Sequence, residues 1–291
     1  MIRFYEYHKM KSVLVGSVMA VLLTMGNAGE AWAQKTLTIL HTNDTHSCIL
    51  PLKKSLTDTT LADRGGYLRR IAMLKEERKQ TPDLLLFDSG DFSQGSSYYT
   101  MFKGDVEVGL MNMMGYDAVT IGNHEFDFGL DNMTRLFKMA NFPVVCSNYD
   151  FAGTELAEIV KPYVVLKRKG LRIGVFALCP PLEGLVAKKN YEPLKFLDPT
   201  ACAQLMVEIL KKQEKCDLVI FLSHLGWGDS EYPCNKVIAQ TRGIDLVLDG
   251  HSHTYFQELR YVTDPDGRQV PVDQNGKHAA FVGKMALEFG K

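Results

Sequence analysis

Side chains that bind metal ions or carry protons follow five short apolar runs of this sequence, at the point where each run ends. The runs are LTIL, LLLF, AVTI, LVIFL and LVL. The polar residues that follow them are Asp44, His46, Asp91, Asn123, His124, Glu125, Asp127, His224, His251 and His253. Five of the eight histidines in the chain fall at these positions. Because ligands of open α/β sheets bind beyond the carboxyl ends of the strands, we expect these groups to converge.

The donor set suits two metal ions rather than one. Three oxygen donors and four imidazoles are available, from Asp44, Asp91, Asn123, His46, His224, His251 and His253. This number exceeds the four protein ligands of one tetrahedral zinc but suits two ions that share a carboxylate. Mixed imidazole and oxygen ligands favour zinc, manganese, iron or cobalt over magnesium. Two ions about 3.5–4 Å apart clamp an in-line displacement and lower the pKa of a bound water towards about 7, which predicts phosphoester hydrolysis.

Taken one at a time, the same residues have ordinary structural explanations. Asp44 and Asp91 are typical of turns or helix caps, since aspartate is favoured in both places. His224 alone fits a hydrogen-bonded core histidine, and Asn123 after a glycine fits a tight turn. The prediction of a metal site therefore rests on the clustering of the whole set.

The composition narrows the range of partners. The formal net charge of the 291 residues is −1, so the sequence carries no electrostatic footprint for polymeric nucleic acid or an anionic membrane surface. A small anionic substrate stays compatible, because bound metal ions reverse the local field. Hydrophobic residues make up 46% of the chain, which is enough for a sizeable core.

Residues 1–33 have the pattern of a secretory signal peptide. Basic Arg3, Lys9 and Lys11 precede the apolar run SVLVGSVMAVLLTM, which is too short to span a bilayer comfortably. The small residues Ala31 and Ala33 then form the pattern that signal peptidase accepts. We expect cleavage after Ala33 and a secreted protein without a stable membrane span, located in the bacterial periplasm. An uncleaved membrane anchor is the alternative.

The six cysteines of the chain contain no C-x-x-C pair that would indicate a zinc knuckle. Cys146 and Cys179 lie in or beside apolar runs, and we predict that both are buried free thiols. Cys48 lies two residues after His46, so a functional role for this thiol remains an alternative.

Short apolar runs alternate with helix-like stretches from residue 36 onward. Helical periodicity predicts helices over 65–80, 105–115 and 199–215, between strands that include FPVV and RIGVFAL. This alternation favours α/β layers around largely parallel sheet. The tail after residue 255 holds a D-P-D-G turn and predicts antiparallel strands. No linker-like tract interrupts residues 34–291, so we predict one domain.

Five motifs occur along the chain in a fixed order: D-x-H at 44–46, G-D at 90–91, G-N-H-E at 122–125, S-H at 223–224 and G-H-x-H at 250–253. In this order they resemble the signature of the calcineurin-like metallophosphoesterases. ILHTNDTHS, GNHEFDFG and DLVLDGHSH resemble more narrowly the N-terminal catalytic domain of secreted bacterial 5′-nucleotidases and 2′,3′-cyclic-nucleotide phosphodiesterases. The resemblance covers residues 36–289.

The resemblance implies an α/β fold of mixed sheets, a single-domain four-layer α-β-β-α sandwich with the metals at the sheet edges. It implies that Asp91 bridges two ions, one held by Asp44, His46 and His253 and the other by Asn123, His224 and His251. His124, like Asn123, would contact the substrate phosphate; His124 would stay off the metals, and Asp127 would orient it and keep it protonated. Glu125 would either support the metal ligands from behind or be structural, and the resemblance gives no ligand role to His41 and His278.

The implied activity is that of a secreted 5′-nucleotidase, in which metal-bound hydroxide attacks the phosphorus of a nucleotide in line. A broad phosphomonoesterase, a cyclic-nucleotide or nucleotide-sugar phosphodiesterase and a thiosulfate-type hydrolase remain open. So does a non-enzymatic metal-binding interaction protein, although neither His124 nor Asp127 would be needed merely to hold ions. The resembled enzymes usually carry a further C-terminal specificity domain. Since this sequence stops at Lys291, we expect either a separately encoded partner that supplies the nucleoside pocket or a broad substrate range.

Overall fold

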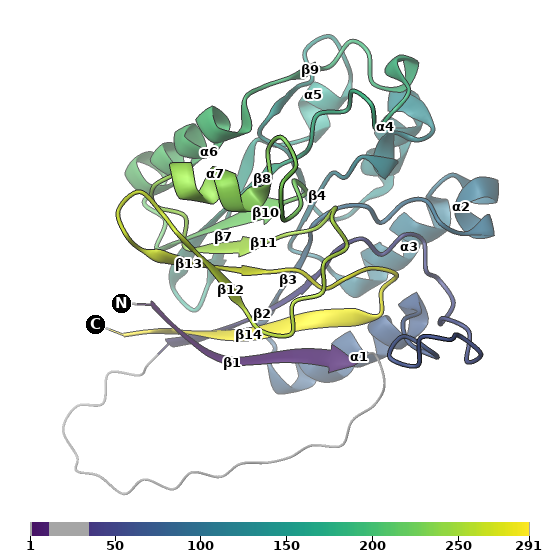
Figure 1. The fold of residues 1–291 in the computed structure, drawn as a ribbon, viewed down its shortest axis with the longest axis horizontal. Helices are drawn as coiled ribbons and strands as arrows, with labels where there is room; N and C mark the ends of the chain where they lie inside the picture. The colour runs from purple at the N-terminus through teal and green to yellow at the C-terminus, as the bar shows by residue number, and fades with distance from the viewer. Residues whose placement is uncertain (1, 12–34, 291) are drawn as a thin grey trace, which may run out of the picture.

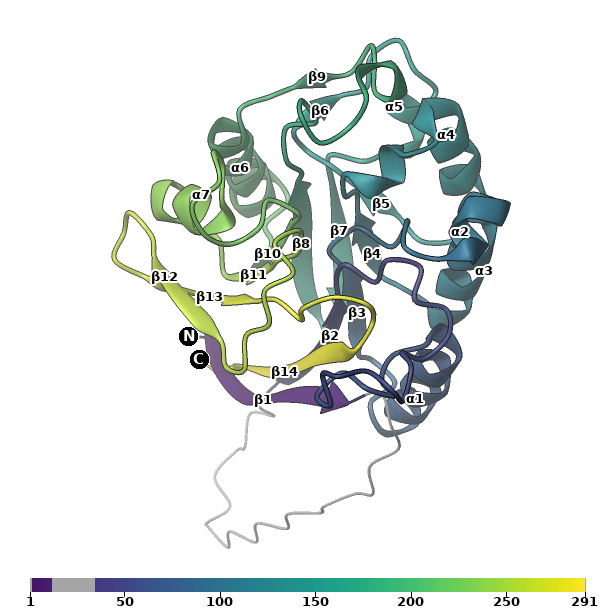
Figure 2. The same cartoon turned by 45° about the vertical axis from the view of Figure 1, so that its right-hand side comes forward.

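Two mixed β-sheets lie face to face between two outer layers of helices (Figure 1). The computed structural model describes residues 2–11 and 35–290. Turning the molecule brings α1, α3 and α4 to one outer side and α6 and α7 to the other, with both sheets between them (Figure 2). The predicted four-layer α-β-β-α sandwich is therefore confirmed.

The first sheet has the order β1-β14-β2-β3-β4-β5. Strands β2 to β5 run parallel to one another, whereas β14 is antiparallel to both β2 and β1. The strands are β1 (Ile2–Lys11), β14 (Phe281–Phe289), β2 (Lys35–Thr42), β3 (Leu85–Asp88), β4 (Ala118–Thr120) and β5 (Val144–Val145).

The second sheet has the order β12-β13-β11-β10-β8-β7. Its four inner strands are parallel, and the two edge strands β12 and β7 are antiparallel to their neighbours. The strands are β12 (Arg260–Thr263), β13 (Gln269–Asp273), β11 (Leu246–Leu248), β10 (Leu218–Ser223), β8 (Leu171–Leu178) and β7 (Tyr163–Arg168). A separate short pair joins β6 (Tyr149–Asp150) to β9 (Lys195–Phe196).

The helices cover the outer face of each sheet. Sheet one is covered mainly by α1 (Tyr67–Gln80), α3 (Asp105–Met114) and α4 (Gly129–Met139), with the shorter α2 (Ser97–Phe102), η1 (His124–Phe126) and α5 (Leu156–Ile159) nearby. Sheet two is covered by α6 (Pro199–Glu208), which continues into the π turn η3 (Ile209–Gln213), and by α7 (Cys234–Gln240). A 3₁₀ turn, η2 (Lys188–Asn190), lies between β8 and β9.

The alternation of side chains along β2 shows how the layers form. Leu37 and Ile39 are buried between the two sheets, whereas Leu40 is buried on the opposite face against the helices. Because successive side chains of a strand point to opposite faces, an apolar run such as LTIL is buried on both sides. This burial on both faces explains why the sequences of these strands are continuous apolar runs.

The three predicted helices are present, with ends that local signals explain. α6 begins at Pro199, where the Asp198 carboxylate accepts a hydrogen bond from the Ala201 N–H at 2.7 Å. α3 ends at Gly115, whose φ of 69° is the left-handed conformation that glycine adopts at low cost. The predicted D-P-D-G turn joins the antiparallel strands β12 and β13.

Strand β1 lies within the segment that we predict as a signal peptide. It pairs with β14 along its length, from Ile2 opposite Phe289 to Lys11 opposite Phe281. The apolar run and the expected cleavage site at Ala33 lie outside the described residues, so the signal peptide stays a prediction. None of the described helices has the length and apolar character that a membrane span requires.

Candidate metal centre

The ends of five parallel strands from both sheets bring the predicted ligands together. β2, β3 and β4 of the first sheet and β10 and β11 of the second lead into this centre. The potential ligands form two groups, and within each group the ligand atoms all lie within 4.8 Å of one another. The first group is Asp44, His46, Asp91 and His253; the second is Asp91, His224 and His251. Since Asp91 belongs to both groups, the arrangement is a candidate dinuclear centre with a shared carboxylate.

In the first group, the imidazole rings of His46 and His253 lie nearly perpendicular to each other, at 88°. Their Nε2 atoms are 2.8 Å apart, and Asp44 Oδ1 lies 3.5 Å from Nε2 of His253. Nδ1 of His46 lies 3.3 Å from the carbonyl oxygen of Ser93, a contact that leaves Nε2 as the free ligand atom. Burial lowers the pKa of both His46 and His253 to about 4, so each imidazole is in the neutral form that metal binding requires.

In the second group, His224 lies against the shared carboxylate. Its Nε2 is 3.1 Å from Asp91 Oδ2, while Nδ1 lies 2.6 Å from the carbonyl oxygen of Ser89. Among the described residues, the buried Oδ1 atom of Asn123 makes no hydrogen bond. A buried polar atom without a partner is costly, and a metal ion bound by Asn123 would satisfy this oxygen. The donor set therefore fits the implied metals.

Several ligand candidates have a strained backbone. Asp44, His46, Asp91, His251 and His253 all have positive φ, between 43° and 69°. Residues other than glycine rarely adopt this left-handed conformation, and in folded proteins such strain gathers at functional sites. The centre is also tightly packed, because a Cβ atom on Gly122 would lie 2.1 Å from Asp91 Oδ1.

Glu125 joins the loops that carry the ligands. Its buried carboxylate accepts hydrogen bonds from the N–H groups of Asp91 and Ser93, both at 3.0 Å, and of Gly122 at 2.6 Å. Burial and the nearby Asp91 charge raise the pKa of Glu125 to about 7. Through these contacts Glu125 holds the loop of Asp91 against the turn that begins at Gly122.

His124 and Asp127 form a pair at the edge of the centre. Nδ1 of His124 lies 3.1 Å from Asp127 Oδ2, and the His124 ring centroid is 5.4 Å from that of His46. Burial lowers the pKa of His124, but the hydrogen bond to Asp127 and the charge of Asp91 outweigh it, so the net shift is upward. Asn190 of η2 donates to the carbonyl oxygen of Asp127 at 2.9 Å and supports the pair from outside.

The sequence analysis missed the segment 273–278, which follows β13 and reaches the metal centre. The N–H of His278 donates to the carbonyl oxygen of Asp44 at 2.8 Å, and the His278 ring lies 5.9 Å from the ring of His46. His41 instead lies within β2, where its Nε2 is 2.6 Å from Asp273 Oδ2. The polar run DQNGKH, which begins at the last residue of β13, was the available signal, since β13 is parallel to β11 and ends at the same edge.

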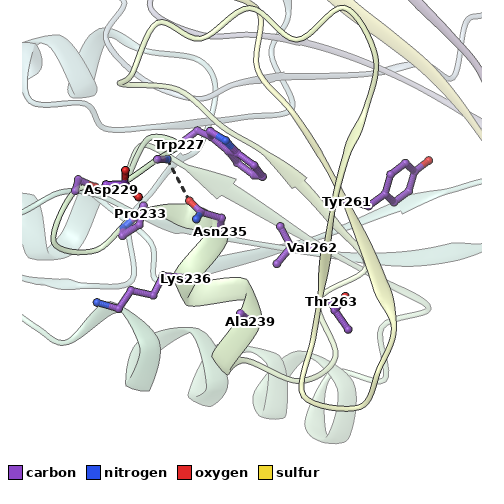
Figure 3. A pocket seen from close by; sticks show the side chains of 11 residues that line it. Trp227, Asp229, Pro233, Asn235, Lys236, Ala239, Tyr261, Val262 and Thr263 are labelled. Atoms are coloured by element: carbon purple, nitrogen blue, oxygen red, sulfur yellow. Dashed lines mark hydrogen bonds between the residues drawn. The ribbon is translucent and has the colours of Figure 1, made fainter.

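A cavity of about 680 Å³ lies between the loop after β10, the start of α7 and the edge strand β12 (Figure 3). The indole of Trp227 and the side chain of Val262 form part of its wall. None of the predicted site residues lines this cavity. The backbone N–H of Trp227 donates to Ser252 Oγ at 3.0 Å, so the cavity wall is joined to the loop that carries His251 and His253.

Comparison with known proteins decides the family. The sequence model of the calcineurin-like phosphoesterases matches residues 37–255. The chain belongs to the calcineurin-like phosphoesterase family. The predicted family and enzyme class, a metal-dependent phosphoesterase, are thereby confirmed. Residues 37–255 include every predicted ligand, from Asp44 to His253.

Within this phosphoesterase family, the chain is similar to the 5′-nucleotidase of Rattus norvegicus, with 31% identity over 93% of the chain and 49% of the rat protein. A 5′-nucleotidase precursor from Thermus thermophilus has a similar structure, with a TM-score of 0.78 and 30% identity over 87% of this chain and 51% of that one. The NAD nucleotidase of Haemophilus influenzae has a TM-score of 0.76 and 27% identity over 88% of this chain and 48% of that one. The chain thus spans about half the length of these relatives.

Proposed function

We propose that this phosphoesterase is a dinuclear 5′-nucleotidase that releases phosphate from nucleotides. The observation that carries the proposal is the position of Asp91 in both ligand groups, with the His124–Asp127 pair directly beside it. Two metal sites sharing a carboxylate are the arrangement that in-line phosphoryl displacement needs. The similar proteins named 5′-nucleotidase support nucleotides as the substrate class.

We assign Asp91 to both ions, with Asp44, His46 and His253 holding one and Asn123, His224 and His251 holding the other. Zinc, manganese and cobalt suit this set of four imidazoles and three oxygen donors. When bound, the ions neutralise the charge of the phosphate and supply a water of lowered pKa as the nucleophile. The protein holds its ligands ready for this, because backbone carbonyls fix the ring orientations of His46 and His224.

His124 acts on the substrate rather than on the metals. Asp127 holds Nδ1, which leaves the Nε2–H free to donate to a phosphate oxygen or to the leaving oxygen. The upward shift of its pKa favours the protonated ring, the form that donates. Asn123 lies between Gly122 and His124 in the sequence, so its amide belongs to the same phosphate-binding turn.

Export to the bacterial periplasm is the second part of the proposal. Residues 1–33 serve as the signal peptide, and residues 34–291 form the catalytic domain. Cleavage after Ala33 would remove β1 and leave β14 paired only with β2 in this sheet. The mass of the protein purified from the periplasm of an exporting host tests this, since a chain retaining residues 1–33 would contradict the proposal.

The substrate assignment is tested by assaying the metal-loaded chain with zinc, manganese and cobalt. The substrates are AMP, UDP-glucose, 2′,3′-cyclic AMP, thiosulfate and an aryl phosphate. Fastest phosphate release from AMP supports a 5′-nucleotidase, whereas preference for cyclic AMP or UDP-glucose would make the chain a phosphodiesterase. Equal rates on AMP and the aryl phosphate would indicate a broad phosphomonoesterase whose nucleoside selectivity comes from a separate partner. Strong nucleoside selectivity of the chain alone would exclude that need for a partner.

A further inference from the structure

The side chain of Asn43 connects the metal ligand Asp44 to the segment 273–278. Asn43 is 3% exposed, and all of its amide groups are engaged. Nδ2 donates to Asp44 Oδ2 at 2.6 Å and to the carbonyl oxygen of Gly276 at 2.8 Å. Oδ1 accepts from the N–H of Asn275 at 2.8 Å. We call these three contacts the amide clamp.

The amide clamp sets which oxygen of Asp44 faces the imidazoles. Oδ2 is the atom that accepts from Asn43, and the N–H of His251 lies within 3.0 Å of both carboxylate oxygens. Oδ1 is the oxygen nearer to the imidazoles, 3.5 Å from Nε2 of His253. The clamp therefore turns one defined oxygen of Asp44 towards the imidazole pair of the first ligand group.

The far side of the clamp is anchored between the two sheets. Asn275 Nδ2 donates to the carbonyl oxygen of His41 at 3.2 Å, and His41 Nε2 lies 2.6 Å from Asp273 Oδ2. His41 and Asp273 are both fully buried. His41 belongs to β2 of the first sheet and Asp273 to β13 of the second, so this contact ties the clamp to both layers.

We propose that Asn43 is a positioning residue for the metal ion of the first ligand group, held in place by the segment 273–278. This proposal rests on the dinuclear centre of the proposed function. Only an amide offers two donors and an acceptor in this geometry. A carboxylate at position 43 would face the Asp44 carboxylate and the Gly276 carbonyl, and three acceptors would then repel one another. Groups that orient metal ligands contribute about 10–100-fold to metal affinity.

The test compares two isosteric substitutions, Asn43→Asp and Asn148→Asp. Asn148 is a matched control, because it is a fully buried asparagine whose side-chain amide also donates to and accepts from backbone groups. It donates to the carbonyl oxygen of Cys179 and accepts from the N–H of Cys179, both at 2.8 Å, and it contacts no ligand candidate. Metal content is measured by elemental analysis. The affinity for each ion is measured by removing the metals with a chelator and titrating the metal-free protein with Mn²⁺ or Zn²⁺ in a calorimeter.

We expect Asn43→Asp to lower the affinity for one of the two ions about 10–100-fold. The affinity for the other ion should stay close to the wild-type value. Asn148→Asp should keep both ions at wild-type affinity even if its melting temperature falls. Asn43→Ala removes the clamp without adding charge, so it reports the same selective loss if Asn43→Asp fails to fold, as judged by circular dichroism. Wild-type affinity for two ions in a folded Asn43 variant would overturn the proposal.

The wild-type chain separates this inference from the proposed function. If the wild type binds two ions but does not hydrolyse nucleotides, the proposed substrate is wrong and the amide clamp is still measurable. If the wild type hydrolyses AMP and a folded Asn43 variant keeps both ions, the function stands and the clamp is wrong.

Discussion

The backbone N–H of His124 donates a hydrogen bond to Asp91 Oδ1 at 2.9 Å. The carboxylate that belongs to both ligand groups therefore also fixes the backbone of the proposed proton donor. The ligand loop after β3 and the turn after β4 are positioned as one unit, which Glu125 reinforces through the N–H groups of Asp91 and Gly122. The following predictions separate the roles within this unit.

Replacing His124 by asparagine should remove catalysis without removing the metals. We expect metal content to stay at the wild-type value, because neither ligand group includes His124. Turnover of AMP should fall about 10²–10⁴-fold, the usual effect of losing an acid–base group. Elemental analysis and steady-state kinetics on the same preparation measure both quantities. Unchanged turnover would remove His124 from the mechanism.

Asp127→Asn should produce a smaller fall in turnover than His124→Asn, since it leaves the ring of His124 in place. The asparagine keeps the side-chain volume but removes the negative charge that helps to raise the pKa of His124. The loss should appear mainly in kcat, with metal content unchanged. A variant as active as the wild type would show that Asp127 does not support His124.

Asp91→Asn should affect both metal sites together. Asp91 is the residue common to the two ligand groups, and its carboxylate supplies the negative charge that a bridging position requires. We expect fewer than two ions per chain by elemental analysis and loss of AMP hydrolysis. A variant that retains two tightly bound ions would contradict the bridging role.

Gly122→Ala and Gly109→Ala should change stability in opposite directions. The new Cβ at position 122 would overlap Asp91 Oδ1, so we expect the free energy of unfolding to fall by about 1–3 kcal/mol. Gly109 lies exposed within α3 with no atom near its would-be Cβ, so alanine there should add about 0.5–1 kcal/mol. Urea denaturation of the two variants measures both changes. A stable Gly122→Ala protein would show that the turn can relax.

Removing the metals should lower the melting temperature, and adding them back should restore it. An ion present at 100 times its Kd stabilises the folded chain by about 2.7 kcal/mol per site. Thermal unfolding with a chelator and then with excess Zn²⁺, Mn²⁺ or Co²⁺ measures the effect. The shift should persist in His124→Asn and shrink in Asp91→Asn. Equal shifts in these two variants would argue against the assigned roles.

Local sequence patterns predicted many of the strands, the helices α1, α3 and α6, and the candidate ligand residues. Apolar runs such as LTIL predict β2 because a strand buried on both faces must be apolar throughout. Apolar residues at helical spacing predict α1 and α3, because one face of each helix is buried. Each run ends in polar residues, so the sequence also predicted where Asp91 and His224 would lie.

Only the tertiary structure decided how these residues are grouped and supported. Asn43 and Asn275 are 232 positions apart in the sequence, yet one hydrogen bond joins them. That contact depends on the order of the strands, which places β2 and β13 in facing sheets, and no local pattern encodes this order. The sequence by itself therefore determined which strand ends carry potential metal ligands and which chemistry those residue types favour. The packing of the two sheets decided which oxygen of Asp44 faces the imidazoles, because that choice is made by contacts between segments distant along the chain.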